Sequence, residues 1–152
     1  MMPRLGTPKQ SGQSTVEFAL TIVIVMVILF GAIELVVMIY TYNVLADAAK
    51  EGVRYAIVHG TGTGAANCSG PGGGGVSCSD STGANIQTVV SNYTRVSFHN
   101  SASMVVSPSF PDSSSVAPSR VRVTISYPYQ PFTRLGWPTM TVNAAAEGRI
   151  VF

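Results

Sequence analysis

The stretch GQSTVEFALTIVIVMVILFGAIELVVMIY, residues 12–40, decides the fold of this chain. From Val16 to Tyr40, the only side chains that are neither apolar nor aromatic belong to Glu17, Thr21 and Glu34. The run exceeds the ~20 residues that a helix needs to cross the hydrocarbon of a bilayer. It is also longer than the ~7 to 15 apolar residues of a cleavable secretory signal. We therefore predict one transmembrane helix, with its span at about residues 16–40.

The helical pattern continues beyond the predicted span. Small and apolar residues recur at helical spacing as far as Val58, with charged residues between them. The segment 13–58 is therefore expected to hold one helix, from about Ser14 to Val58. Its length of ~67 Å is roughly twice the hydrocarbon thickness, so half of it should project from the bilayer.

Three small residues of the projecting half, Ala48, Gly52 and Ala56, lie four positions apart and share one helix face. The missing side-chain bulk allows another element to approach closely. This helix packing face has two interpretations. It seats a helix of a neighbouring subunit, or it packs against the sheet of its own chain.

The flanks of the span and the two cysteines predict its orientation. The leader, residues 1–12, carries Arg4 and Lys9 and no acid, which favours a cytoplasmic N-terminus. Cys68 and Cys78 lie in a Gly/Ser-rich loop, residues 59–83, that is flexible enough to let them meet. A disulfide between them would require an oxidising compartment outside the cytoplasm. The alternative is two separate thiols in a reduced loop.

The residues outside the long helix are sufficient for one small domain. A short helix is expected over Ala84–Tyr93, because Ile86, Val89, Val90 and Tyr93 follow helical spacing. The best strand is Arg120–Tyr127, in which apolar and polar residues alternate. Further strand candidates are 96–98 with 103–107, and 139–146 with 148–152. With prolines between them, these segments predict an extracytoplasmic α+β head over residues 84–152, built on a small antiparallel sheet of three or four strands.

Composition argues against several other functions. The net charge of +2 falls to near zero if the leader is removed, so no basic patch for nucleic acid is expected. His59 and His99 are the only histidines, and no cysteine or acid stands at metal-ligand spacing from them. The sequence lacks a Gly-x-Ser-x-Gly elbow and a phosphate loop. We therefore expect no enzyme activity, cofactor, metal or small-molecule substrate.

The junction between leader and span resembles the processing signature of type IV prepilins. Gly12 is followed at an interval of five by Glu17 and then by Phe18. The resemblance implies cleavage by a prepilin peptidase after Gly12, which makes Gln13 the new N-terminus. A second interpretation needs no protease, because Ser14 and Glu17 also form a capping box at a helix start. The two roles are compatible.

The two acids of the span need partners, because an isolated carboxylate in hydrocarbon costs ~2.5 to 3.5 kcal/mol. For Glu17 the partner would be the α-amine of Gln13, from its own chain or from an incoming subunit, which would give axial register. Glu34 lies about 26 Å farther along the helix and could reach water near the headgroups. Alternatively it makes an intramembrane contact with another subunit.

Three segments resemble the TadE-like family of the tight-adherence (Tad) machinery: residues 12–20, residues 30–34 (Phe-Gly-Ala-Ile-Glu) and residues 48–56 (Ala-Ala-Lys-Glu-Gly-Val-Arg-Tyr-Ala). The resemblance implies a pseudopilin or minor pilin in the inner membrane that supports assembly of a Flp-type pilus or related secretion. Implied partners are the membrane, the prepilin peptidase, other pilins and Tad assembly proteins. The alternative is an uncleaved single-span protein whose periplasmic head binds a ligand or partner.

Overall fold

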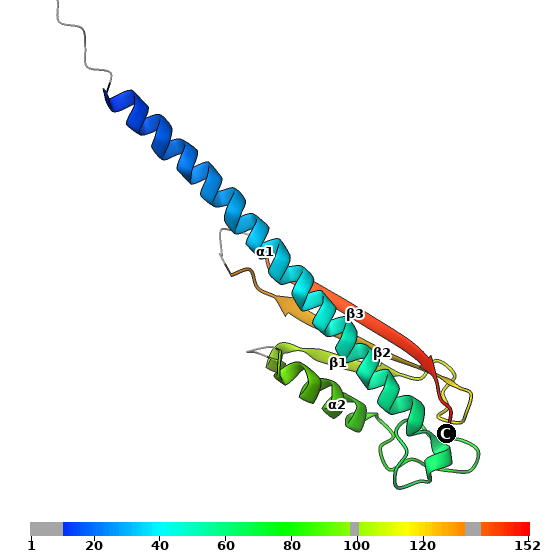
Figure 1. Ribbon diagram of the computed structural model, residues 1–152. Helices are drawn as coiled ribbons and strands as arrows, with labels where there is room; N and C mark the ends of the chain where they lie inside the picture. The colour runs from blue at the N-terminus through cyan, green and yellow to red at the C-terminus, as the bar shows by residue number, and fades with distance from the viewer. Residues whose placement is uncertain (1–10, 98–100, 133–137) are drawn as a thin grey trace, which may run out of the picture. The chain divides into compact units, whose positions relative to one another are not determined.

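The computed structural model describes residues 11–97, 101–132 and 138–152. Its elements are α1 (Ser11–Val58), α2 (Ala84–Arg95), β1 (Val105–Ser109), β2 (Arg120–Tyr129) and β3 (Met140–Arg149), with two short 3₁₀ turns at Thr61–Thr63 and Ser101–Ser103 (Figure 1). The predicted α+β class, with a long N-terminal helix, is confirmed. Leader residues 1–10, and the expectations for Phe98 and His99, lie outside the described residues.

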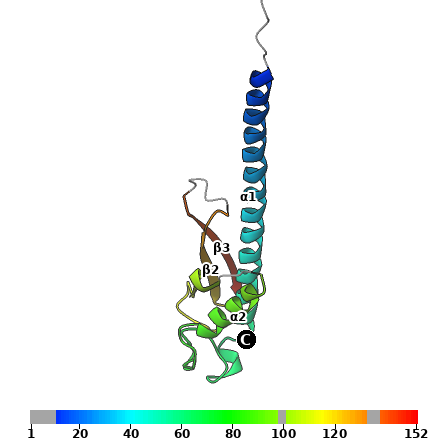
Figure 2. The ribbon, with the colours of Figure 1, turned by 90° about the vertical axis from the view of Figure 1, so that its left-hand side faces the viewer.

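The sheet is antiparallel in the order β1-β2-β3. Along β2, Val121, Val123 and Ile125 are fully buried, whereas the alternating positions Arg120 and Arg122 are exposed. This alternation gives the sheet one apolar face and one wet face. Residues 38–58 of α1 and the buried side of α2 cover the apolar face, in a single core (Figures 1 and 2).

The strands differ from the sequence prediction in two places. Residues 96 and 97 form a turn after α2 instead of beginning a strand. The candidates 139–146 and 148–152 merge into one strand, β3, which begins at Met140, passes through Gly148 and ends at Arg149, so residues 150–152 are not strand. Gly148 is accommodated there because β3 lies so close to α1 that an added Cβ would meet Val53 and Ile57 side-chain carbons at 2.7 Å. The described residues therefore contain three strands.

Two of the prolines that were expected to separate strands lie inside them. Pro108 belongs to β1, which is an edge strand, so its missing N–H leaves the central pairing intact. Pro128 belongs to the central strand β2, but β1 pairs with β2 only as far as Ser126. At Pro128 the strand has a single neighbour, β3, and one of its edges is open.

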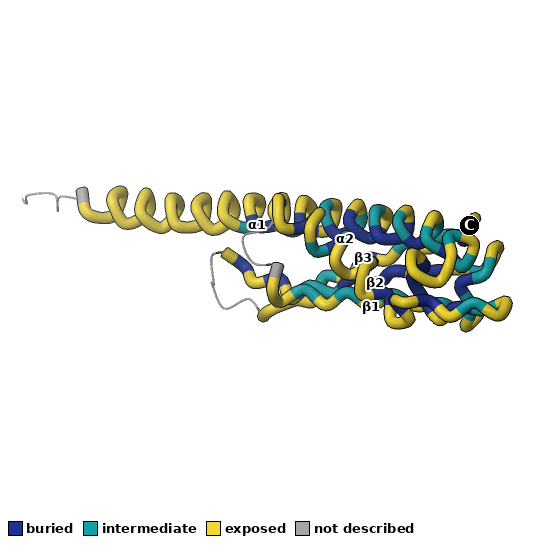
Figure 3. Tube along the Cα trace, turned by 90° about the horizontal axis from the view of Figure 1, so that it is seen from below, coloured by how far each residue is buried: buried dark blue, intermediate teal, exposed yellow. Residues whose placement is uncertain are grey.

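Helix α1 begins at Ser11, three residues before the predicted start, and ends at Val58, the predicted end. The chain divides into two compact units, Met1–Val37 and Met38–Phe152. In the first unit most described side chains of α1 are exposed, as Figure 3 shows along the tube. In the second unit, which we call the head, α1 has one buried face. By length and apolar composition, α1 is the one helix of the described chain that could cross a membrane.

Candidate functional site

The residues of the processing junction lie in the first two turns of α1. Gly12 has open space around it, since an added Cβ would meet no atom within 4 Å. Glu17 is exposed, and its carboxylate accepts a hydrogen bond of 3.3 Å from the Gln13 side-chain amide. Phe18 is 69% exposed. Gln13 and Glu17 therefore face one another one helical turn apart, on a surface that is open to a second molecule.

The capping-box interpretation of Ser14 differs from the structure. An N-cap residue precedes the first helical turn, whereas Ser14 is the fourth residue of α1. The side chain of Glu17 pairs with Gln13, and its carbonyl oxygen accepts a hydrogen bond of 2.8 Å from the Thr21 hydroxyl. In the chain that retains its leader, Ser14 and Glu17 are thus interior helix residues, because the helix extends into the leader.

The small-residue face of α1 packs inside the head. Ala48 and Ala56 are fully buried, and Gly52 lies between them. A Cβ added to Gly52 would come within 2.6 Å of Val90 Cγ2 and 3.4 Å of both Ile86 Cγ2 and Val123 Cγ1. Two of these neighbours belong to α2 and one to β2. The interpretation that a neighbouring subunit's helix occupies this face therefore does not fit, because the chain's own helix and sheet already fill it.

Glu34 differs in burial from the residues next to it in the span. It is 6% exposed, whereas Ile33 and Leu35 on either side are each 54% exposed. This burial does not distinguish the two interpretations of Glu34, which are access to headgroup water and contact with another subunit. Both stay predictions.

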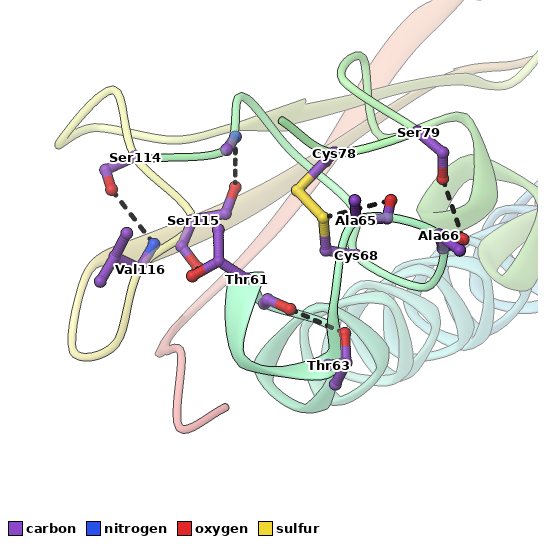
Figure 4. Close-up of a disulfide and its surroundings, with 12 residues drawn as sticks. Thr61, Thr63, Ala65, Ala66, Cys68, Cys78, Ser79, Ser114, Ser115 and Val116 are labelled. Carbon is purple, nitrogen blue, oxygen red and sulfur yellow. Dashed lines mark hydrogen bonds between the residues drawn. A yellow bond between two sulfur atoms is a disulfide. The ribbon is translucent and has the colours of Figure 1, made fainter. Parts of the chain in front are cut away.

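Cys68 and Cys78 form a disulfide, with their Cα atoms 5.1 Å apart. The segment around it is ordered by hydrogen bonds to the connection between β1 and β2. The Ser115 amide donates to the Gly72 carbonyl at 2.8 Å, and the Gly72 amide donates to the Ser115 hydroxyl at 3.3 Å (Figure 4). Residues 59–83 are therefore a structured part of the head rather than a slack linker.

Two carboxylates that the sequence analysis did not single out hold the loops of the head. Asp80 caps α2, because its two carboxylate oxygens accept the backbone N–H groups of Ala84 at 2.7 Å and Asn85 at 2.9 Å. Asp112 accepts the Arg120 backbone N–H at 2.8 Å and the Arg120 Nη2 at 2.7 Å. These hydrogen bonds from Arg120 lower the pKa of Asp112 to about 2.

The sequence signals for these two anchors are weak. Asp80 stands three residues before Gly83, the N-cap position of α2, so it lies outside the usual cap spacing. Gly83 makes the approach feasible by adopting a left-handed conformation with φ of 74°. Asp112 and Arg120 are eight residues apart, and only the turn between β1 and β2 brings them together.

The head has a shallow apolar hollow of about 240 Å³ lined by Met38, Ile39, Tyr42 and Val142. All four lining residues are apolar or aromatic, and none of them is charged. Across residues 11–97, 101–132 and 138–152, no three His, Cys, Asp or Glu side chains gather to hold a metal ion.

Comparison with known proteins assigns the N-terminal part of the chain. Residues 12–54 match the model of a family described as TadE-like protein, in agreement with the resemblance found in the sequence. No curated protein and no solved structure matches the chain. The match covers less than a third of the chain and lies within α1, the helix that is long and apolar enough to cross a membrane. The family match ends inside α1, so it leaves the rest of the head unassigned.

Proposed function

We propose that this chain is a pseudopilin or minor pilin of a Tad machinery, processed by a prepilin peptidase after Gly12. The observation that carries the proposal is a coincidence of three features. The TadE-like match begins at Gly12, the apolar helix α1 begins one residue earlier at Ser11, and Glu17 is exposed one turn after Gln13. A membrane anchor alone would need only the second of these.

The local structure supports cleavage between Gly12 and Gln13. This bond lies in the first turn of α1, where backbone N–H groups have no partner within the helix. Helix ends open at little cost in free energy, so a protease can draw the bond into an extended conformation. Gly12 adds no side chain that would obstruct this approach.

Cleavage gives Glu17 a charged partner. The new α-amine of Gln13 lies one helical turn from the Glu17 carboxylate, whose present partner is the Gln13 amide. Opposite charges 4 Å apart interact by ~4 kcal/mol at an effective dielectric of 20. Because Glu17 is exposed, the amine of an incoming subunit can replace the intramolecular one and fix the axial position of that subunit. Glu17 would thus act in assembly.

The remaining parts of the proposal concern topology and partners. A disulfide at Cys68–Cys78 supports a head outside the cytoplasm, and the basic leader supports an N-terminus inside it. The chain would then be a single-pass protein of the inner membrane. Its partners would be the prepilin peptidase, other pilins and the Tad assembly proteins of that membrane. It would be a structural or assembly factor.

The experiment compares Glu17→Ala with Glu51→Ala in cells that produce the pilus. Both residues are exposed or half-exposed acids of α1, but Glu51 lies in the head and pairs with Arg54 at 3.6 Å. We expect Glu17→Ala to be cleaved normally and to fail to join the pilus complex, measured by co-purification and by pilus yield. Glu51→Ala should behave like the natural chain. Normal assembly by Glu17→Ala would refute the pairing role.

A further inference from the structure

Met38 is the first residue of α1 that belongs to the head, and it marks one end of the head. Val142 of β3 meets Met38, Ile39 and Tyr42 at the apolar hollow. At its other end, β3 reaches Val53 and Ile57 through Gly148. Strand β3 therefore runs in the same direction as α1, and β2 pairs antiparallel with β3 so that Tyr129 lies opposite Met140. Figure 1 shows β2 ending and β3 beginning at this end of the sheet, which we call the Met38 end.

The Met38 end of the head exposes large apolar side chains. Phe132, three residues after β2, is 83% exposed, and Met140, the first residue of β3, is 38% exposed. Val105, the first residue of β1, pairs with Ser126 near the end of β2 and is 60% exposed. The apolar hollow is lined by Val142, two residues after Met140 in β3. Hydrophobic residues exposed singly are ordinary, but several at one end of a small domain, next to an apolar hollow, mark a contact surface.

The position of this end identifies what it contacts. The apolar run of α1 ends at Tyr40, so the helix leaves the hydrocarbon within three residues of Met38. Tyr40 and Tyr42 are 55% and 50% exposed, and tyrosines concentrate where a helix crosses the headgroup layer of a bilayer. Val106, Tyr127 and Val142 pack against the core that α1 joins from Leu45 onward. The ends of β1, β2 and β3 at the level of Met38–Tyr42 are therefore held beside that layer.

From this arrangement we infer that the Met38 end of the head inserts into the headgroup layer of the membrane, with Phe132 and Met140 as its apolar contacts. The inference rests on the proposed membrane anchoring of α1 and adds a second attachment that the head itself provides. Transfer of such side chains from water to the bilayer interface removes apolar surface from water, which is the usual basis of interfacial binding. The opposite end of the head, which holds the disulfide loop and Phe152, would remain in water.

Tryptophan variants of the full chain test this inference. In a Trp137→Phe background, single tryptophans are placed by Phe30→Trp, Phe132→Trp and Phe152→Trp. The chains are reconstituted in phosphatidylethanolamine–phosphatidylglycerol vesicles with or without brominated acyl chains, which quench nearby tryptophans. Phe152 is a matched control because it is 58% exposed and lies against Gly60 and Gly62, near the end of α1.

We expect brominated lipid to quench position 132 strongly, with a blue-shifted emission, and to leave position 152 unchanged. Quenching at position 30 reports the anchoring itself. Quenching at 30 without quenching at 132 overturns the inference and leaves the anchoring intact, whereas no quenching at 30 refutes the anchoring. If the emission of the tryptophan at position 132 is blue-shifted only at a high protein-to-lipid ratio, and brominated lipid does not quench it, a second copy of the chain covers this position and the inference is wrong. Met140→Trp repeats the test if Phe132→Trp fails to fold.

Discussion

At Gly52, α1 packs against α2 with no room for a side chain, and replacing this glycine gives a sharp prediction. In an ordinary helix interior, Gly→Ala stabilises by about 1 kcal/mol. At Gly52 the added methyl would lie 2.6 Å from Val90 Cγ2, so something must move. Val90 is β-branched and lies in a helix, where one rotamer dominates, so its methyl cannot simply rotate away. Overpacking of this kind costs about 1 to 3 kcal/mol.

The two effects combine to a net loss of stability. We expect Gly52→Ala to lower the free energy of unfolding of the head by ~0 to 2 kcal/mol, instead of raising it by ~1 kcal/mol. In a Val90→Ala background the obstructing methyl is gone, so the same substitution should now stabilise the head. The sign of the effect therefore reverses between the two backgrounds.

The assay is denaturant unfolding of the full chain in detergent micelles, followed by near-ultraviolet circular dichroism. Gly31→Ala is the matched control, because an added Cβ there would meet no atom within 4 Å. It should leave the unfolding of the head unchanged. If Gly52→Ala stabilises the head with Val90 in place, the described packing of α1 against α2 is wrong.

Three further substitutions test the anchors of the head by unfolding measurements. Asp80→Ala removes two hydrogen bonds from the start of α2 and should lower the free energy of unfolding by about 1 to 2 kcal/mol. Asp80→Asn should lower it less, because one acceptor remains. An Asp80→Ala variant as stable as the natural chain would contradict the capping role. Cys68→Ser opens a short loop and should cost about 2 to 3 kcal/mol, an effect that reductant should reproduce in the natural chain and not in the variant. The pKa of Asp112 is lower folded than unfolded, so its contribution to stability is complete above about pH 4 and is lost as the pH falls toward 2. Asp112→Asn should remove that part of the acid dependence, and an unchanged profile between pH 2 and 5 would contradict it.

The long helix could be predicted from the sequence because its signal is local. An apolar run of membrane length, continued by small residues at helical spacing, requires no knowledge of distant contacts. Strand β2 was predictable for the same reason, since its alternation of valine with polar residues is visible in the sequence. The first residue of α1 was harder to predict, because helix ends fray and Ser14 is a residue type that often caps a helix.

Features that depend on tertiary contacts could not be predicted. Helical spacing placed Ala48, Gly52 and Ala56 on one face but could not say which partner fills it, because small residues suit any close approach. Pro108 reads as a strand break unless one knows that β1 is an edge strand. The pairing of Asp112 with Arg120 arises from the path of a turn that has no recognisable motif.

The central claim, that this chain is processed as a pilin, is tested most directly by the mass of its N-terminal peptide. The protein would be extracted from membranes of producing cells with and without the prepilin peptidase. The account predicts a chain that begins at Gln13 when the peptidase is present and one that retains the leader when it is absent. An intact leader in both cells would contradict it.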